Sequence, residues 1–360
     1  MRSKDTTEPA IPARKDVHLD LCLERPVESG VATGLDALTL EYDALPEVNL
    51  DDVDLGVTFL GRRLAAPLMV GAMTGGSPRA AEINARLARA AARVGVGMAL
   101  GSQRAMIVDE SLTSTYALRD AAPDLPLLLG NIGAVQLNYG VGLGDIERAL
   151  HAVGADGVNF HLNPLQEAIQ PEGNTRFAGL ERRLGEIINA LGLPVLVKEV
   201  GAGISGRTAR KLARLPLAGV EVAGVGGTSW ARVESYRAPE GSAARAAGIA
   251  LSGFGVPTAV SLRACRRELP PSCAVVASGG LRSGMDVAIA LALGADLTAL
   301  AQPLVKAAAE SEDAVVQLLE RLIYELKVIC FCTGACDVAA LRQVRVLGGG
   351  YEDVCTREKD

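Results

Sequence analysis

Short apolar runs alternate with longer amphipathic stretches along most of this chain. From residue 65 onward the amphipathic stretches carry apolar residues at helical spacing, and the apolar runs have the length of buried strands. Predicted helices include 78–95, 179–192 and 283–294, the last two ending in a glycine that suits a left-handed C-cap. The eight predicted strands are 66–73, 96–102, 125–131, 156–162, 194–200, 218–224, 274–280 and 295–301. This order predicts repeated β–α units.

A ninth apolar run, at 256–262, is better interpreted as the start of a helix, because Pro257 suits a first helical turn. Eight parallel strands with intervening helices close into a barrel more economically than they form an open sheet. An open doubly wound sheet is the alternative, but no strand leads into the GxGxxG turn of a dinucleotide-binding fold. We therefore predict the α/β class, as a (β/α)8 TIM barrel with long loops at its C-terminal face.

The predicted barrel occupies most of one domain. Residues 1–13 are polar and are predicted to be disordered, and 346–360 form a C-terminal tail. A single domain spans 14–345, in which 14–64 form an N-terminal arm or cap across one barrel face and 65–328 form the barrel. After the sixth strand the chain makes a long excursion, and loops of this kind are commonly functional.

Composition narrows the class of protein. Of the 360 residues, 49% are hydrophobic and only 3% aromatic, which allows a large, closely packed core. The net charge of −6 gives no basic field for nucleic acid, and no apolar run is long enough to span a membrane. The N-terminus lacks a hydrophobic signal segment, so we expect a cytoplasmic protein.

The chain contains seven cysteines, which fit reduced thiols better than a disulfide scaffold. Cys330, Cys332 and Cys336 lie close together, and three thiols could bind a metal ion. Their spacing matches no paired zinc motif, and we interpret the segment as a helix end.

Polar or glycine-rich segments follow all eight predicted strands. In a parallel barrel these positions meet at the C-terminal face, where active sites lie. The segments are 72–76, 101–104, 130–133, 161–167, 198–199, 226–230, 278–282 and 301–302. The glycine-rich turns after the sixth and seventh strands offer unobstructed backbone N–H groups, which bind phosphate. We predict a phosphate-bearing cofactor there, with plain structural turns as the alternative.

Three candidate side chains follow the fourth and fifth strands. Lys198 lies at the barrel rim, where an ammonium could bind a flat anionic ring; an exposed ion pair with Glu199 is the alternative. Glu167 can hold Mg²⁺ that keeps most of its waters, and the amide of Gln166 can position a proton beside a stronger acid. Capping of the following turn is the alternative for this pair.

Two further groups remain undecided from the residues alone. His161 is as consistent with a structural histidine as with a base. Arg14 and Lys15 are either solvated cations or a clamp for a diphosphate.

Seven segments together resemble the type 2 isopentenyl diphosphate isomerase family, from about residue 14 to 345. RKD near the N-terminus and HLNPLQE are the most specific of them. The segments are RKDVHL (14–19), AMTGG (72–76), GSQR (101–104), HLNPLQE (161–167), VKEVGAGIS (197–205), GVGGTSW (224–230) and SGGLRSG (278–284).

The resemblance implies an enzyme that interconverts isopentenyl and dimethylallyl diphosphate with reduced FMN, Mg²⁺ and NADPH as reductant. It also implies a homo-oligomer, a tetramer or octamer. Its FMN contacts would be Ala72, Met73, Thr74, Ser102, Asn131, Lys198, Thr228, Gly279, Gly280, Arg282, Ala301 and Gln302. Its substrate contacts would be Arg14, Lys15, Ser102, Arg104, His161, Asn163 and Gln166.

The implied chemistry is protonation of the terminal alkene carbon, followed by loss of a proton from the methylene attached to the other alkene carbon. Flavin N5 or N1 would be the acid and base, with Gln166 and His161 as the catalytic side chains and Glu167 as the metal ligand. Ala223 departs from the family pattern, which commonly has serine there, so one hydroxyl near the flavin phosphate is missing.

Two other functions compete with this one. An FMN oxidoreductase of the hydroxy-acid oxidase or inosine-monophosphate dehydrogenase kind would share the barrel and its phosphate loop. Such enzymes need a strand-end histidine base or a loop cysteine, and the loop at 224–230 has neither. A non-catalytic flavin-binding barrel is disfavoured by Arg14, Lys15, Gln166 and Glu167, which cofactor binding does not require.

Overall fold

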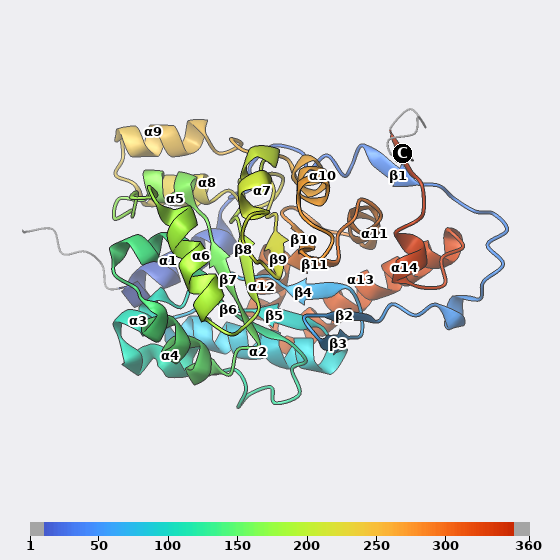
Figure 1. Ribbon diagram of the computed structural model, residues 1–360, viewed down its shortest axis with the longest axis horizontal. Coiled ribbons are helices and arrows are strands. Elements are labelled where there is room, and N and C mark those ends of the chain that lie inside the picture. The colour runs from blue at the N-terminus through green and yellow to red at the C-terminus, as the bar shows by residue number, and fades with distance from the viewer. Residues whose placement is uncertain (1–10, 349–360) are drawn as a thin grey trace, which may run out of the picture.

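A closed barrel of eight parallel strands forms the centre of the molecule (Figure 1). The computed structural model describes residues 11–348. In order around the barrel, the strands are β4 (Leu68–Val70), β5 (Gly97–Ala99), β6 (Leu128–Gly133), β7 (Gly157–His161), β8 (Val195–Lys198), β9 (Gly219–Glu221), β10 (Ala274–Ser278) and β11 (Leu297–Leu300), which pairs back with β4. Each overlaps one predicted run, and the (β/α)8 TIM barrel is confirmed.

Helices connect the strands and cover the outside of the barrel (Figure 1). The apolar run at 256–262 contributes to helix α10, as predicted. Along the chain, the helices after the first strand are α2 (Pro78–Val94), α3 (Arg104–Val108), α4 (Leu143–Val153), α5 (Pro164–Ile169), α6 (Leu180–Ala190), α7 (Gly206–Leu212), α8 (Trp230–Arg237), α9 (Ala243–Ala250), α10 (Thr258–Glu268), α11 (Gly284–Ala292), α12 (Gln302–Glu310), α13 (Glu312–Cys332) and α14 (Val338–Leu341). Three short 3-10 helices are η1 (Leu50–Asp52), η2 (Glu110–Thr115) and η3 (Ala134–Tyr139).

The barrel interior changes from apolar to polar along the strands. Side chains alternate between the two faces of a strand, so residues two apart point the same way. Leu129 and Leu196 lie in the apolar cluster inside the barrel, and two residues further on the same strands bring Asn131 and Lys198 to the C-terminal end. The strand pattern thus places polar groups at one mouth of the barrel above an apolar filling.

The N-terminal arm reaches both ends of the barrel, whereas we predicted a cap across one face. Helix α1 (Ile11–Glu24) packs against α2, α8 and α12. The hairpin of β2 (Val57–Phe59) and β3 (Arg62–Leu64) lies at the opposite mouth, because Phe59 joins the interior apolar cluster and Arg62 pairs with Asp156, just before β7. The arm therefore closes the apolar mouth and leaves α1 beside the polar one.

Two predicted boundaries differ from the structure. Helix α1 begins at Ile11, so 11–13 are helical rather than disordered; a proline in a first turn is tolerated because those N–H groups have no intrahelical partner. At the other end, β12 (Val346–Gly348) pairs antiparallel with β1 (Leu38–Leu40), so the first residues of the predicted tail form a strand. Residues 1–10 and 349–360 lie outside the described part of the chain.

Other features of the described residues bear on the sequence predictions. No helix between 11 and 348 is long and apolar enough to cross a membrane. Cys330 is buried in α13, while Cys332 and Cys336 are more exposed. Across these residues, no cluster of three histidine, cysteine or acidic side chains is arranged to hold a metal ion, which removes support for a thiolate site.

Replacing Phe59 with alanine tests the role of the hairpin in closing the barrel. Phe59 is 4% exposed, so Phe59→Ala leaves a cavity and lowers the free energy of unfolding by about 3 to 5 kcal/mol. Urea denaturation monitored by circular dichroism measures the change. The control is Thr58→Ala on the exposed face of the same strand, with an effect below about 0.5 kcal/mol. Equal losses of stability in the two variants would contradict the role of Phe59 in closing the barrel.

Candidate active site

Two neighbouring pockets open at the polar mouth of the barrel. Counted together with the solvent-open space at their mouths, the first has an empty volume of about 780 Å³ and the second of about 560 Å³. Five residues line both of them: Ala72, Met73, Lys198, Val200 and Trp230. The two pockets therefore adjoin, and ligands bound in them would lie next to each other.

All but one of the predicted site residues line these pockets. The first is lined by Arg14, Lys15, Ser102, Arg104, Asn131, His161, Asn163, Gln166 and Glu167, the second by Thr228, Gly279, Gly280, Arg282, Ala301 and Gln302, and both by Ala72, Met73 and Lys198. The exception is Thr74, which is buried and whose carbonyl oxygen accepts a hydrogen bond from Asn84 of α2. Its Oγ1 is buried and has no hydrogen-bond partner among the described residues, and the predicted cofactor contact stays a prediction.

The second pocket is bounded by glycine-rich loops after β9 and β10. Gly279 and Gly280 have φ values of 100° and 82°, in the left-handed region that favours glycine. A Cβ on Gly227 would lie 2.6 Å from the backbone nitrogen of Gly280. Within residues 11–348, neither the Thr228 nor the Gly280 backbone N–H donates a hydrogen bond to protein. The close approach of the two loops thus leaves N–H groups available to a phosphate.

A buried ion pair lies at the boundary between the two pockets. The ammonium of Lys198 donates to the carbonyl oxygen of Glu199 at 2.6 Å and lies 3.7 Å from Glu221 Oε1. Ser278 Oγ donates to the same Glu221 oxygen at 2.8 Å. Lys198 and Glu221 are register partners on β8 and β9, which brings the two charges together. The alternative of an exposed Lys198–Glu199 pair is wrong, because both residues are buried.

Glu199 organises the loop after β8. Its Oε2 accepts backbone hydrogen bonds from Val200 and Gly201, each at 2.6 Å, and also from Ala202 and Gly203. A carboxylate that receives several N–H donors holds the backbone in one conformation. Val200 lines both pockets, so Glu199 shapes their shared wall from behind.

The first pocket collects positive charge. Arg14, Lys15 and Arg104 all line it, and burial together with the charges of Arg14 and Arg104 lowers the pKa of Lys15 to about 8. In the described part of the chain, no carboxylate lies within ion-pair distance of the Lys15 ammonium. A cation cluster of this kind is stabilised by a bound anion.

His161 is held neutral in the same pocket. Burial, followed by the charges of Lys198 and Lys15, lowers the pKa of His161 to about 3. Its Nδ1 lies 2.9 Å from Asn131 Oδ1, and because a carboxamide oxygen only accepts, this contact places the proton on Nδ1. At neutral pH, His161 can therefore both donate and accept hydrogen bonds as an uncharged imidazole.

Asn163 sets the orientation of Gln166 and Glu167 at the start of α5. Its Nδ2 donates to Gln166 Oε1 and to Glu167 Oε1, each at 3.0 Å, while the backbone N–H of Asn174 donates to Glu167 Oε2. Asn163 Oδ1 is buried and, among the described residues, has no hydrogen-bond partner. In this arrangement Asn163 offers an acceptor, which suits water or a cation better than a phosphate oxygen.

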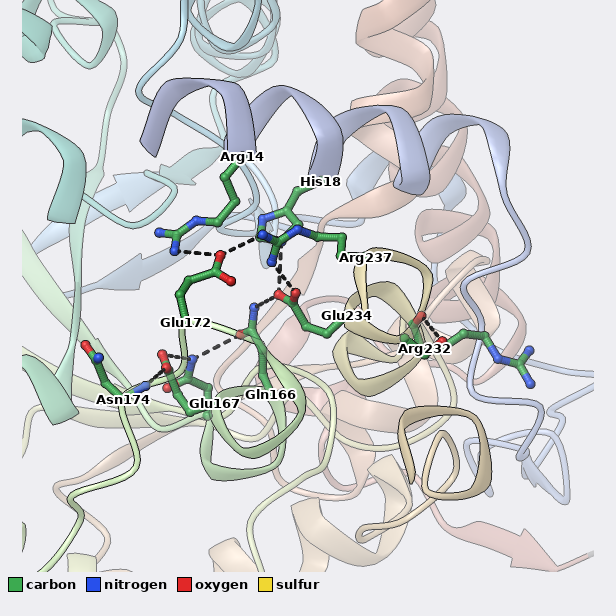
Figure 2. Close-up of polar contacts among 11 residues, drawn as sticks. Arg14, His18, Gln166, Glu167, Glu172, Asn174, Arg232, Glu234 and Arg237 are labelled. Carbon is green, nitrogen blue, oxygen red and sulfur yellow. Dashed lines mark hydrogen bonds and ion pairs between the residues drawn. The ribbon is translucent and has the colours of Figure 1, made fainter. Parts of the chain in front are cut away.

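A buried carboxylate that sequence analysis missed lies behind Gln166. Glu234 of α8 is fully buried, accepts a hydrogen bond from Gln166 Nε2 at 3.0 Å, and lies 2.9 Å from His18 Nε2 (Figure 2). Burial alone would raise the pKa of Glu234, but His18, Arg237 and the amide of Gln166 lower it to about 2. Glu234 is thus an ionised acceptor at neutral pH.

Four further missed residues surround Glu234. His18 stacks edge to face on Trp230, with ring centroids 5.3 Å apart, and both line the first pocket. Arg237 and Glu172 continue the ion pairs away from the pocket (Figure 2). His18 and Trp230 lie within the quoted motifs and could have been found there, whereas Glu234 and Arg237 lie in the predicted loop excursion, which the structure folds into α8 and α9.

Comparison with known proteins agrees with this geometry. The FMN-dependent dehydrogenase family pattern matches residues 169–347. Among solved structures, a mandelate oxidase mutant with an FMN adduct superimposes with a TM-score of 0.64 at 22% identity, covering 92% of this chain and 95% of that one. Identity this low shows a shared fold and nothing more.

Curated relatives are more similar in sequence to this chain than that solved structure is. An isopentenyl-diphosphate delta-isomerase of a Synechococcus strain is 48% identical over 341 residues, covering 94% of this chain and 97% of the relative. The enzyme of the same name from Deinococcus radiodurans is 46% identical, with 94% and 99% covered. The chain belongs to the type 2, FMN-dependent isopentenyl-diphosphate delta-isomerase family.

Proposed function

We propose that this protein interconverts isopentenyl diphosphate and dimethylallyl diphosphate beside a reduced FMN, with Mg²⁺ bound at Glu167 and NADPH as reductant. The observation that carries this proposal is the pair of adjoining pockets. One is bounded by a glycine cradle, and the other combines cations with Gln166 and Glu167. A cofactor and a small anionic substrate fit side by side in this arrangement.

The residues of the second pocket fit FMN. The free N–H groups of Thr228 and Gly280 would bind its phosphate, and Lys198 would face the ring system. Ala72 and Met73 line the apolar side shared with the first pocket. When bound, reduced FMN supplies an electron-rich ring and an exchangeable proton on a ring nitrogen. Ala223, which has no hydroxyl, also lines this pocket, and backbone N–H groups could compensate for that missing hydroxyl.

The first pocket fits an isoprenoid diphosphate and its metal ion. Arg14, Lys15 and Arg104 would bind the diphosphate oxygens. Glu167 would supply the one protein carboxylate that a largely hydrated Mg²⁺ requires, with water bridging to the buried Asn163 oxygen. Ser102 lies on the same wall and offers a hydroxyl to either ligand.

The proposed reaction adds a proton to the terminal alkene carbon, which leaves positive charge on the adjacent tertiary carbon, and then removes a proton from the methylene attached to that tertiary carbon, with no net redox change. Gln166 is fixed at both ends of its amide, by Asn163 and by ionised Glu234. It therefore orients the alkene and the transferred proton rather than supplying that proton. Ionised Glu234 is buried close behind Gln166 and would stabilise positive charge that develops on the substrate.

We assign His161 to substrate binding. A pKa near 3 makes its imidazole too weak a base for proton transfer at neutral pH, while its neutral form can hydrogen-bond a diphosphate oxygen or a metal-bound water. This revises the catalytic role suggested by the family resemblance.

An oxidoreductase remains the second candidate and is less favoured. Within the described residues, no cysteine lines either pocket, and the loop after β9 carries no histidine. We further propose a cytoplasmic homo-oligomer, a tetramer or octamer, on the strength of the family resemblance alone.

An anaerobic assay with FMN, Mg²⁺ and NADPH tests the proposed function. We expect conversion of isopentenyl diphosphate to depend on the reductant without consuming it stoichiometrically. Glu167→Gln should raise the Mg²⁺ concentration needed for half-maximal activity by about tenfold or more, because a neutral amide is a weaker ligand. Activity without reductant, a reduced product formed in step with NADPH oxidation, or an oxidised product formed in step with flavin reduction would contradict the proposal.

Gly227→Ala tests the glycine cradle independently of activity. Its Cβ would approach the Gly280 nitrogen at 2.6 Å and force the loops apart, weakening FMN binding by about tenfold. Quenching of FMN fluorescence on titration with protein gives the affinity. Gly144→Ala on α4, where the nearest atom is 3.6 Å away, is the control. Unchanged affinity in Gly227→Ala would place the phosphate elsewhere.

The lowered pKa of Lys15 predicts a pH dependence. Lys15 is protonated below about pH 8 and loses its charge as pH rises through that value. The kcat/KM for isopentenyl diphosphate should therefore fall above about pH 8. Lys15→Arg keeps its charge, so its alkaline fall should move to higher pH. An identical alkaline limb in both proteins would exclude Lys15 as its source.

A further inference from the structure

Arg237 connects the buried carboxylate of Glu234 with the partly buried carboxylate of Glu172 (Figure 2). Arg237 itself does not line the first pocket. Its Nη2 lies 2.6 Å from Glu172 Oε1, and its Nη1 pairs with Glu234 Oε2. Only 9% of the Arg237 side chain is exposed, and its partners Glu172 and Glu234 are 16% and 0% exposed. The two terminal nitrogens of the Arg237 guanidinium, Nη1 and Nη2, therefore pair with different carboxylates.

Each of these carboxylates holds a residue that faces the substrate. Glu172 Oε1 also accepts from Arg14 Nη1 at 3.1 Å, so it fixes one cation of the diphosphate clamp. Glu234 Oε1 accepts from Gln166 Nε2 and faces His18. A continuous chain of charge-assisted contacts runs from Arg14 through Arg237 to Gln166.

We propose that Arg237 is a positioning residue that holds the diphosphate clamp and the Gln166 amide in one fixed arrangement. The proposal rests on the proposed function, because it assigns Arg237 a part in that reaction. Without Arg237, among the described residues, Glu172 would retain only its contact with Arg14, and Glu234 only those with Gln166 and His18, so no cation would join the two carboxylates. Removing one partner of a buried ion pair leaves a charge that is not fully compensated. Lysine is a poor substitute, because a single ammonium cannot direct two N–H arms along separate lines.

The pH dependence of activity separates this role from a purely structural one. The titratable and charged groups that act on Glu234 are Lys15, His18 and Cys22 of α1, with Arg237 on its own helix, and Gln166 of α5 donates to it. Loss of Arg237 removes one of the influences that keep the pKa of Glu234 low. That pKa then rises, and activity that needs ionised Glu234 is lost at a higher pH on acidification.

The test compares Arg237→Met, Arg237→Lys and Glu172→Gln in the FMN-loaded enzyme. Arg237→Met should raise KM for isopentenyl diphosphate about tenfold, lower kcat about a hundredfold and move the acid limb to higher pH. Arg237→Lys should recover part of each effect. Glu172→Gln should raise KM about tenfold while leaving the acid limb in place, because it disturbs only the Arg14 side.

Arg232 on the same helix provides the matched control. It is also half-buried, but its guanidinium contacts the carbonyl oxygen of Glu28 and the hydroxyl of Ser252, away from Glu234. Arg232→Met should keep KM and kcat within about twofold of the unmodified enzyme. The flavin absorption spectrum of every variant reports whether the cofactor site has folded.

Binding of inorganic pyrophosphate, measured by calorimetry, gives a readout that does not need turnover. Arg237→Met should weaken it about tenfold. Unchanged pyrophosphate affinity, or lower activity that merely tracks loss of bound flavin with KM and pH profile intact, would overturn the role of Arg237. Absence of isomerase activity in the unmodified protein would instead refute the proposed function, and the two failures are thereby distinguished.

Discussion

Burial of charge at the polar mouth of the barrel is the constraint on which the site depends. An ionised group removed from water is stable only with a partner of opposite charge or several hydrogen bonds. Lys198 meets this requirement through Glu221 on the neighbouring strand, and Glu234 meets it through His18 and Arg237. Lys15 has no carboxylate partner in the described chain, so the unmatched charge is left for a ligand. The unpaired charge of Lys15 supports the proposal that this pocket binds an anion.

In the proposed function, the two halves of the site would bind phosphate groups in different ways. Around the second pocket, Gly227, Gly279 and Gly280 remove side chains so that two loops meet backbone to backbone and present N–H groups. Around the first, Arg14 and Lys15 approach on α1, a helix from outside the barrel. A cofactor that stays bound suits rigid loops of the barrel itself. A substrate that must enter and leave suits side chains on an added helix.

The sequence was sufficient for the fold and for residues that lie on the barrel rim. Regular alternation of apolar runs and helical stretches identified every strand of the barrel, but not the short strands β1, β2, β3 and β12 outside it. Because the ends of barrel strands converge, Lys198, His161 and Gln166 could be placed together in advance. Glu221 could not be placed, because it lies within an apolar run and its role depends on strand register with Lys198.

Contacts between residues that only packing brings together could not be predicted from the sequence either. Glu172 lies far along the chain from Glu234 and Arg237, which are neighbours on α8. A charged stretch such as 231–248 has the composition of a solvated loop until α8 packs against α5. For the same reason, the sequence could not predict that the N-terminal arm contacts both mouths of the barrel. Phe59 reveals its role only when its contacts inside the barrel are known.

The central claim is that a substrate held beside reduced FMN gains and loses protons without net oxidation. Anaerobic incubation of isopentenyl diphosphate with the FMN-loaded enzyme, Mg²⁺ and NADPH in D₂O tests it most directly, with products followed by NMR. The account predicts deuterium in the new methyl group of dimethylallyl diphosphate, with no stoichiometric oxidation of NADPH. Formation of an oxidised product in step with flavin reduction, or isomerisation without solvent deuterium in the methyl group, would contradict it.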